Sequence, residues 1–328
     1  MYIAGDPAVP LSIPPGALQP GAVGWSNLDA TTQQVASSSG FRNRIMNGDF
    51  RVSQRTAGTP SVGTVTYLVD RWYTWQSGAA CAVSVVGSTN WNARYIRAVG
   101  VAGNTTVNFG QRIEAANIMD LAGKVVTLSG YAIRTLGGVV QQTNYITNTL
   151  DNWASATSLG TVSLGVLPAN VFTPFRLNFT LPSTVINGLQ VEFECPNLLA
   201  GDYFGLADIQ LEAGNNPAPV FERKPSRYTF ADCQRYYVQI PLSLWPGNPA
   251  AGANVDFRIS QTYPVPMRGV PTGMYVTAGT LMNVSTEQFM AYGLVGGGDC
   301  TGFGYRIVSA AAGNLYADGR VWSFDAEI

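Results

Sequence analysis

Apolar and polar residues alternate over many short segments of the chain, from about Phe41 onward. In the segment 189–194, Leu189, Val191 and Phe193 alternate with a glutamine and two glutamates. This period of two predicts a β-strand with one face toward a hydrophobic core. On this pattern we predict strands at 64–68, 71–75, 82–86, 95–99, 105–112, 125–133, 139–145, 161–164, 172–181, 189–194 and 203–211.

Turn-forming residues punctuate these segments. Asn47-Gly48, Gly137-Gly138 and Asn187-Gly188 supply residues that tolerate positive φ. Many short strands with turns between them are typical of an antiparallel sandwich or jelly roll. The predicted fold class is therefore all-β, with a jelly-roll β-sandwich over residues 41–225.

A second strand-rich stretch follows a charged junction near residue 222. Residues 228–237 predict a short helix, with Ser226 as its N-cap and an end before Pro241. Further strands are predicted at 256–263, 273–276, 289–294, 304–308 and 320–327. We expect residues 226–328 to form a short helix and a smaller C-terminal β domain.

The first 40 residues differ from the rest. Five of the first twenty are prolines, which fix φ and remove backbone donors, so the stretch should be extended. It also carries apolar side chains such as Leu11 and Trp25, which a solvated linker does not need. We expect residues 1–40 to be an extended N-terminal docking arm; a floppy tail is the alternative.

The composition points toward a surface that partners cover. Charged residues make up 12% of the chain, about half of the usual ~25%. Among 19 basic residues only Lys124 and Lys224 are lysines, and interfaces favour arginine over lysine. A GC-rich genome would also favour arginine codons, so both explanations stay open.

Several function classes are disfavoured by the same numbers. A net charge of −1 gives no electrostatic footprint for nucleic acid, and no apolar run is long enough to span a membrane. The chain has no histidine, and its four cysteines form no Cys-x-x-Cys pair. We therefore expect no enzyme, no cofactor and no metal, with the thiols buried in a protein made in reducing cytoplasm.

Two regions carry a family resemblance. They are Asn43-Arg-Ile-Met-Asn-Gly-Asp-Phe-Arg-Val-Ser-Gln-Arg55 with Tyr67-Leu-Val-Asp-Arg-Trp72, and the set 207–214, 219–223 and 233–237. Together they resemble a widespread group of bacteriophage tail-fibre and related virion proteins. The closing Phe324-Asp-Ala-Glu327 is similar to the end of that group's C-terminal unit.

The block from Asn43 to about Glu212 also resembles the carbohydrate-binding jelly rolls of secreted glycosidases. Those modules begin with an Asn-Gly-x-Phe-Glu phrase, and the resemblance implies that this Glu helps to hold a structural calcium ion. Here Arg51 stands at that position. We therefore predict no metal site, although Asp49 and Asp208 can still lie near each other.

Three residues are candidates for glycan binding. Arg71, Tyr73 and Trp75 share one face of the predicted strand 71–75. Aromatic rings stack on sugar C–H faces and a guanidinium bonds to hydroxyls, so this face can serve as a glycan platform. The same residues can instead pack in a core or against a neighbouring subunit.

One carboxylate pair has the spacing of a glycosidase. Glu192 and Glu194 lie two residues apart on a predicted strand, which places the bases of their side chains about 6.6 Å apart on one face. This distance is near the ~6.5–9.5 Å that separates the two catalytic carboxyl groups of inverting glycosidases. A solvent-exposed strand face gives the same pattern without catalysis. We predict no catalytic residue.

The sequence as a whole predicts a structural component of a bacteriophage particle, made in the host cytoplasm and placed in the virion tail. It would be a tail fibre or spike subunit that docks on other virion proteins through residues 1–40 and contributes to recognition of a host-surface glycan. The resemblance implies a homotrimer. The alternatives are a head-decorating fibre or tail connector without a receptor role and, less favoured, a polysaccharide depolymerase.

Overall fold

The computed structural model describes residues 41–87, 94–217, 219–247, 256–277, 280–282, 284–291, 300–310 and 315–328. Residues 1–40, where we predict the docking arm, lie outside the described residues.

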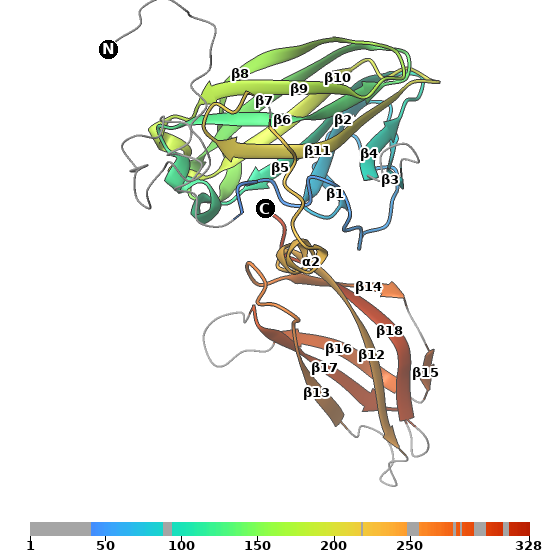
Figure 1. Cartoon of the computed structure of the whole chain (residues 1–328). Helices are drawn as coiled ribbons and strands as arrows, with labels where there is room; N and C mark the ends of the chain where they lie inside the picture. Colours follow the sequence, from blue (N-terminus) through green and yellow to red (C-terminus); the bar gives the residue numbers. More distant parts are fainter. Residues whose placement is uncertain are drawn as a thin grey trace, which may run out of the picture.

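An antiparallel β-sandwich of the jelly-roll type forms the larger part of the described chain (Figure 1). Its six-stranded sheet has the order β1-β2-β5-β10-β7-β8 and its five-stranded sheet the order β3-β4-β11-β6-β9. The strands are β1 (Thr66–Val69), β2 (Trp72–Gly78), β3 (Ala82–Gly87), β4 (Arg94–Val99), β5 (Asn104–Ile113), β6 (Val125–Arg134), β7 (Gly138–Thr149), β8 (Asn152–Leu167), β9 (Thr173–Thr180), β10 (Leu189–Pro196) and β11 (Tyr203–Ala213). The predicted all-β class is confirmed.

The core of this sandwich lies between the two sheets. Leu189, Val191 and Phe193 of β10 are fully buried, as their alternation predicts. Phe193 packs on Phe175 of β9, with ring centroids 5.4 Å apart, and so connects the two layers. Burial of each such side chain contributes roughly 1.5–3 kcal/mol to folding.

A second, smaller β unit follows. One sheet has the order β12-β18-β14 with β15 also paired to β18, and the other has the order β13-β17-β16. The strands are β12 (Tyr237–Gly247), β13 (Asp256–Thr262), β14 (Thr272–Thr277), β15 (Thr280–Met282), β16 (Val284–Ala291), β17 (Gly302–Ser309) and β18 (Leu315–Asp325). It has its own core, in which Phe303 and Phe324 pack at 4.5 Å between ring centroids.

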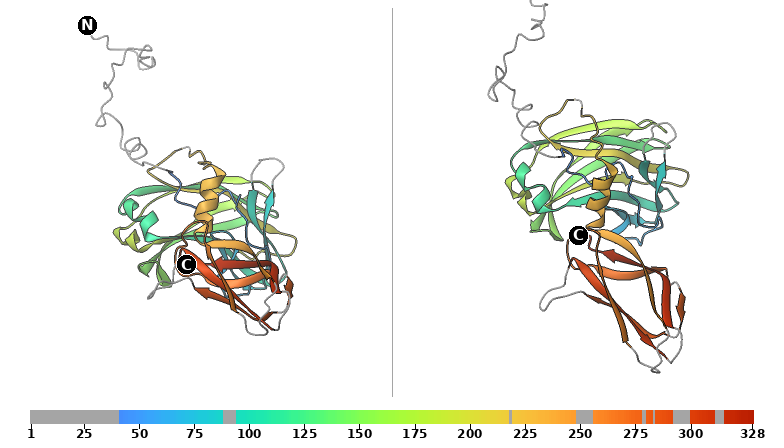
Figure 2. Two further views of the ribbon diagram at one scale, coloured as in Figure 1. Left: turned by 90° about the horizontal axis from the view of Figure 1, so that it is seen from below. Right: turned by 60° about the horizontal axis from the view of Figure 1, so that its bottom comes forward.

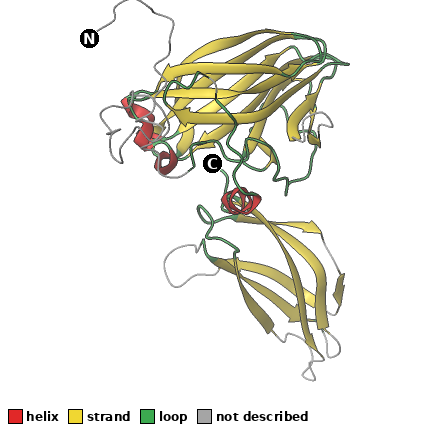
Figure 3. Ribbon diagram, viewed as in Figure 1, coloured by secondary structure: helices red, strands yellow, loops and turns green. Residues whose placement is uncertain are grey.

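In the part of the chain that the structure describes, helical structure is confined to short segments (Figure 3). Three 3-10 turns lie at one end of the jelly roll: η2 (Ala115–Asn117), η3 (Met119–Leu121) and η4 (Ser183–Asn187). The helix α2 (Ser226–Gln234) lies where the two β units meet. Its N-cap is Pro225, so Ser226 is the first helical residue and not the cap that we predicted.

The two β units are held together by buried ion pairs. Arg71 of the jelly roll pairs with Glu327, just beyond β18, and its backbone N–H also donates to the Glu327 carboxylate. Arg55 pairs with both Asp325 and Glu327, at 2.7 and 3.3 Å. The guanidinium of Arg71 lies over the ring of Tyr236, 3.5 Å from its centroid. Figure 2 shows the C-terminus in this position beside α2.

A second cluster completes the junction. The buried carboxylate of Glu114 accepts hydrogen bonds from the Tyr236 hydroxyl at 2.8 Å and from Arg235 and Arg268 at 3.2 and 2.6 Å. Burial alone would raise the pKa of Glu114, but these three partners hold that pKa below its ordinary value of 4.5. Glu114 thus ties the jelly roll to both the α2 end and the β13–β14 connection.

Candidate functional site

The structure places two of the three predicted glycan-binding residues in the interior. Arg71 and Tyr73 are each 1% exposed. Arg71 precedes β2, with φ of 69°, and its charge is paired with Glu327. The Tyr73 hydroxyl donates to Glu192. Neither residue can contact a sugar in this conformation, so the expected three-residue platform is wrong for Arg71 and Tyr73.

Trp75 is partly exposed on the outer face of the six-stranded sheet. Its register partner on β5 is Asn108, and the same register continues to Glu194, Gln141 and Ser163 on β10, β7 and β8. Residues directly opposite each other in neighbouring strands point to the same face. The five side chains therefore form one row across the sheet, which we call the outer row.

A buried carboxylate lies next to the outer row. Glu192 accepts hydrogen bonds from the hydroxyl of Tyr73, from Nδ2 of Asn108 at 2.8 Å and from Nε2 of Gln190 at 3.2 Å. Burial raises the pKa of Glu192, while the Tyr73 and Asn108 hydrogen bonds oppose that rise. One member of the Glu192–Glu194 pair is thus fixed as a hydrogen-bond acceptor.

A glycine makes this arrangement possible. Gly110 of β5 is the register partner of both Tyr73 and Glu192. A Cβ at Gly110 would overlap the ring of Tyr73. The missing side chain lets Tyr73 reach across β5 to Glu192, which positions the carboxylate beside the outer row.

Two buried polar atoms on this face have no hydrogen-bond partner within the described chain. They are Oδ1 of Asn108, a residue that is 5% exposed, and Nε1 of Trp153. Arg112 contacts both Tyr73 and Trp153, because its guanidinium carbon lies 5.4 Å from the ring centroid of each. Buried polar groups are normally hydrogen-bonded, so these two atoms are exceptions in the packing beneath this face.

The last residue of the chain covers one end of this face. The main-chain oxygen of Ile328 accepts hydrogen bonds from the Tyr67 hydroxyl and from Nη1 of Arg112, the latter at 2.7 Å. The part of the face that carries Trp75 and Glu194 is farther from these contacts along the strands. The members of the outer row other than Asn108 are therefore accessible.

Asp49 and Asp208 do lie near each other, as the resemblance to carbohydrate-binding jelly rolls allows. Arg223 contacts both carboxylates, at 2.9 Å from Asp208 and 3.7 Å from Asp49. Arg51 pairs with Asp49 from the other side. Two guanidinium groups thus neutralise the carboxylates at this place.

Other candidate chemistry is limited in the residues that the structure describes. No group of three or more His, Cys, Asp or Glu side chains that suits a metal ion occurs among them. The four cysteines are free thiols, and Cys81, Cys195 and Cys233 are buried. Within the same residues, no helix combines the length and the apolar character that a membrane crossing requires.

The motifs that carry the virion-protein resemblance meet at the junction of the two β units. Arg55 and Arg71 come from the first region, Tyr236 from the second and Glu327 from the closing phrase, and all four belong to one network. Those motifs therefore have a structural role.

No protein-family model matches the sequence, and neither does any curated protein. Solved structures do align with about half of the chain. The active domain of tailspike protein 4 from bacteriophage CBA120 is 14% identical with a TM-score of 0.36, over 52% of this chain and 21% of that one. A putative sugar-binding protein from Bacteroides thetaiotaomicron is 12% identical with a TM-score of 0.39, over 53% and 100%. A CBM4 module is 16% identical with a TM-score of 0.34, over 52% and 99%.

This chain therefore spans about a fifth of the tailspike domain that it matches. With identities and TM-scores this low, the function has to be argued from the side chains described above.

Proposed function

We propose that this protein is a structural subunit of a bacteriophage particle, a tail fibre or spike, that binds a host-surface glycan on the outer row of its jelly roll. The bound glycan is held without being cut. Attachment to the particle is through residues 1–40, and three copies of the chain assemble together.

The observation that carries the glycan proposal is the composition of the outer row. A partly exposed indole, two amides, a carboxylate and a hydroxyl stand side by side across five strands. Sugars present C–H faces that suit an indole and hydroxyls that both donate and accept hydrogen bonds. The side chains of Trp75, Glu194 and Gln141 are partly exposed and that of Ser163 is exposed, so a sugar can reach these four members of the row.

The virion part of the proposal is supported by sequence. The resemblance covers the motifs that build the junction, and the chain has only 12% charged residues. Low charge suits a protein whose surface is covered in an assembly. A head-decorating fibre or tail connector remains the second candidate, since it would need the same junction but no outer row.

Binding without hydrolysis is supported by the state of Glu192. A general acid must be free to exchange its proton with the leaving group. Glu192 is buried and engaged by three side chains, so it serves as a hydrogen-bond acceptor. Shortening of host polysaccharide by the pure protein would contradict this part.

The test is particle adsorption and glycan binding by a Trp75→Ala variant, with Tyr228→Ala as a matched control. Tyr228 is an exposed aromatic residue on α2, away from the outer row. We expect Trp75→Ala to weaken binding of purified host polysaccharide about tenfold or more, while thermal stability stays near that of the parent. Tyr228→Ala should bind as the parent does.

Unchanged glycan binding and adsorption in a folded Trp75→Ala variant would refute the outer row as the site. If Trp75→Ala unfolds, Glu194→Gln or Gln141→Ala on the same row provides the test, because both residues are only partly buried. A parent protein that binds no host polysaccharide would favour the connector role.

A further inference from the structure

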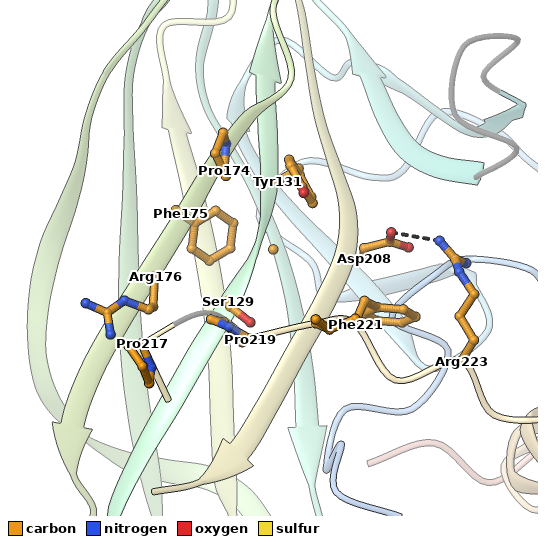
Figure 4. Close-up of a pocket in the computed structure, with 12 residues that line it drawn as sticks. Ser129, Tyr131, Pro174, Phe175, Arg176, Asp208, Pro217, Pro219, Phe221 and Arg223 are labelled. Carbon is orange, nitrogen blue, oxygen red and sulfur yellow. Dashed lines mark hydrogen bonds and ion pairs between the residues drawn. The ribbon is translucent and has the colours of Figure 1, made fainter. Parts of the chain in front are cut away.

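A hollow of about 610 Å³ opens on the other sheet of the jelly roll. Its floor is formed by β6, β9 and β11, and the segment 219–223, which we call the crossing segment, passes over one side (Figure 4). This volume lies in the range of small-ligand pockets. The two sheets are the two layers of one sandwich, so this outer face points away from the outer row.

A bulge in β11 shapes the hollow. Pairing between β11 and β6 shifts between Ala207 and Gln210, and Asp208 within the shift has a φ of 49°. Bulges redirect side chains and often occur beside functional sites. Gly130 lies opposite the bulge, and a Cβ there would stand 2.6 Å from Ile209. The glycine in the facing strand leaves room for the Ile209 side chain, and the bulge places Asp208 at the wall.

The walls of the hollow combine rings with prolines. Tyr131 of β6 and Phe221 of the crossing segment are both partly exposed, and Pro174 and Pro219 line the space beside them (Figure 4). Such surfaces suit the C–H face of a flat, weakly polar ligand. The crossing segment is held in place, since Gln210 donates to the Val220 carbonyl and accepts from the Glu222 N–H.

The polar groups at and beside the hollow are three guanidinium groups, of Arg51, Arg176 and Arg223, and the two carboxylates of Asp49 and Asp208. Asp208 pairs with Arg223, and the neighbouring Asp49 pairs with Arg51. The nearby Arg176 donates to the Asn216 carbonyl at 3.0 Å. Oδ1 of Asp208, a residue that is 6% exposed, has no hydrogen-bond partner in the described chain. A cation in the hollow would meet the guanidinium groups of Arg176 and Arg223, and an anion beside Asp208 would meet its carboxylate, so a neutral ligand suits this wall.

We propose that this hollow is a second saccharide site, in which a neutral sugar ring packs between Tyr131 and Phe221 and hydrogen-bonds to Arg223, which Asp208 holds in place. The inference takes the class of ligand from the proposed function and places it on the opposite face of the sandwich. One jelly roll then holds sugar residues on both faces. In a trimer, two sites on each chain would double the number of sites compared with one site on each chain. The avidity for a polysaccharide would then rise although the affinity of each single site is unchanged.

The test uses ligand-observed NMR with glucose, galactose, mannose, N-acetylglucosamine and rhamnose as probes, each at tens of millimolar. The background is Trp75→Ala, so that the outer row is impaired. We expect at least one probe to bind this variant, and Phe221→Ala added to it to weaken that binding about tenfold. Phe230→Ala is the matched control, because Phe230 is an exposed phenylalanine on α2 and should change nothing.

The outcomes separate the two sites. If the parent binds a probe and Trp75→Ala abolishes that binding, the proposed function is supported and the second site is excluded. Binding that survives Trp75→Ala and disappears with Phe221→Ala supports the second site. Inorganic phosphate that binds at the hollow in place of the sugars overturns the neutral-ligand assignment. No binding of any probe to the parent overturns the second site, while host polysaccharide still tests the first.

Folding of the variants is checked by thermal unfolding. If Phe221→Ala lowers the melting temperature, Tyr131→Ala replaces it, since Tyr131 is partly exposed on the opposite wall. Crystals soaked with the strongest probe give an independent answer, and density for a sugar between Tyr131 and Phe221 is the expected result. Only water at that place would contradict the proposal.

Discussion

At the scale of single residues, the main feature of the junction between the two β units is a buried arginine in an ion pair. Arg71 is fully buried with its charge paired to Glu327. A buried ion pair contributes little when intact, but removal of one partner leaves an uncompensated charge in the interior. Stability at the junction should therefore respond strongly to the loss of either partner.

Glu327→Gln should lower the free energy of unfolding by about 3–5 kcal/mol, since Arg71 would stay charged and buried without its partner. Denaturant unfolding of the purified protein measures the change. Asp120→Asn is the control, because Arg44 and Asp120 form a pair that is largely exposed, and its loss should cost less than about 1 kcal/mol. Equal effects of the two variants would contradict the role of the junction.

Glu114 should contribute a pH-dependent part of the stability. The pKa of Glu114 is lowered in the folded chain, so its contribution is fully present above the unfolded value of 4.5 and is lost as the pH falls through the folded value. The stability advantage of the parent over Glu114→Gln should therefore shrink below about pH 4.5. Unfolding curves of both proteins between neutral pH and pH 3 measure it, and a constant difference would exclude the linkage.

The candidate sites show what the sequence could and could not predict about single residues. Trp75 was placed on an outer face by alternation alone, because alternation is local. The burial of Arg71 and Tyr73 depends on Glu327 and Glu192, which are 256 and 119 residues away in sequence. The outer row and the hollow require the register of distant strands, which no local pattern contains.

At the scale of elements, the alternation of apolar and polar residues predicts most strands correctly. It fails for a strand that contains a proline. Predicted strands such as 125–133 and 203–211 match β6 and β11 closely. β12 was missed, because Pro241 within it suggested a helix end followed by a loop. β12 is an edge strand of its sheet in the described chain, and an edge tolerates a residue that cannot donate.

The position of Pro241 gives a test of this explanation. Its register partner is Val321 of β18, which lies between β12 and β14 in the sheet. Val321→Pro should destabilise the protein by about 3 kcal/mol or more, because a central strand loses a ladder hydrogen bond. Pro241→Ala should change the stability by less than about 0.5 kcal/mol. Thermal or denaturant unfolding compares the two, and similar losses would mean that β12 is not an edge.

At the scale of the whole molecule, assembly remains a prediction. We expect a stable homotrimer formed through residues 226–328, on the basis of the low charge, the arginine bias and the resemblance. Analytical ultracentrifugation at micromolar concentration gives the mass. A clean monomer near 35.0 kDa would contradict it.

Deletion of residues 1–40 should leave a folded protein, because both hydrophobic cores lie within the described residues from Ile45 to Ala326. Circular dichroism and thermal unfolding test the folding. The deletion should also abolish incorporation into particles, since the arm is expected to make the attachment. Normal incorporation of the shortened protein would show that attachment lies elsewhere.

The junction has a mechanical consequence for the proposed function. Glu327 lies two residues beyond the end of β18, and Arg55 and Arg71 pair with its carboxylate, while Arg235 and Arg268 pair with Glu114. A swivel between the units would have to break several buried charge pairs at once. In the proposed fibre, a sideways force on the C-terminal β unit would therefore pass through the junction as torque to the jelly roll, as it does along a stiff lever.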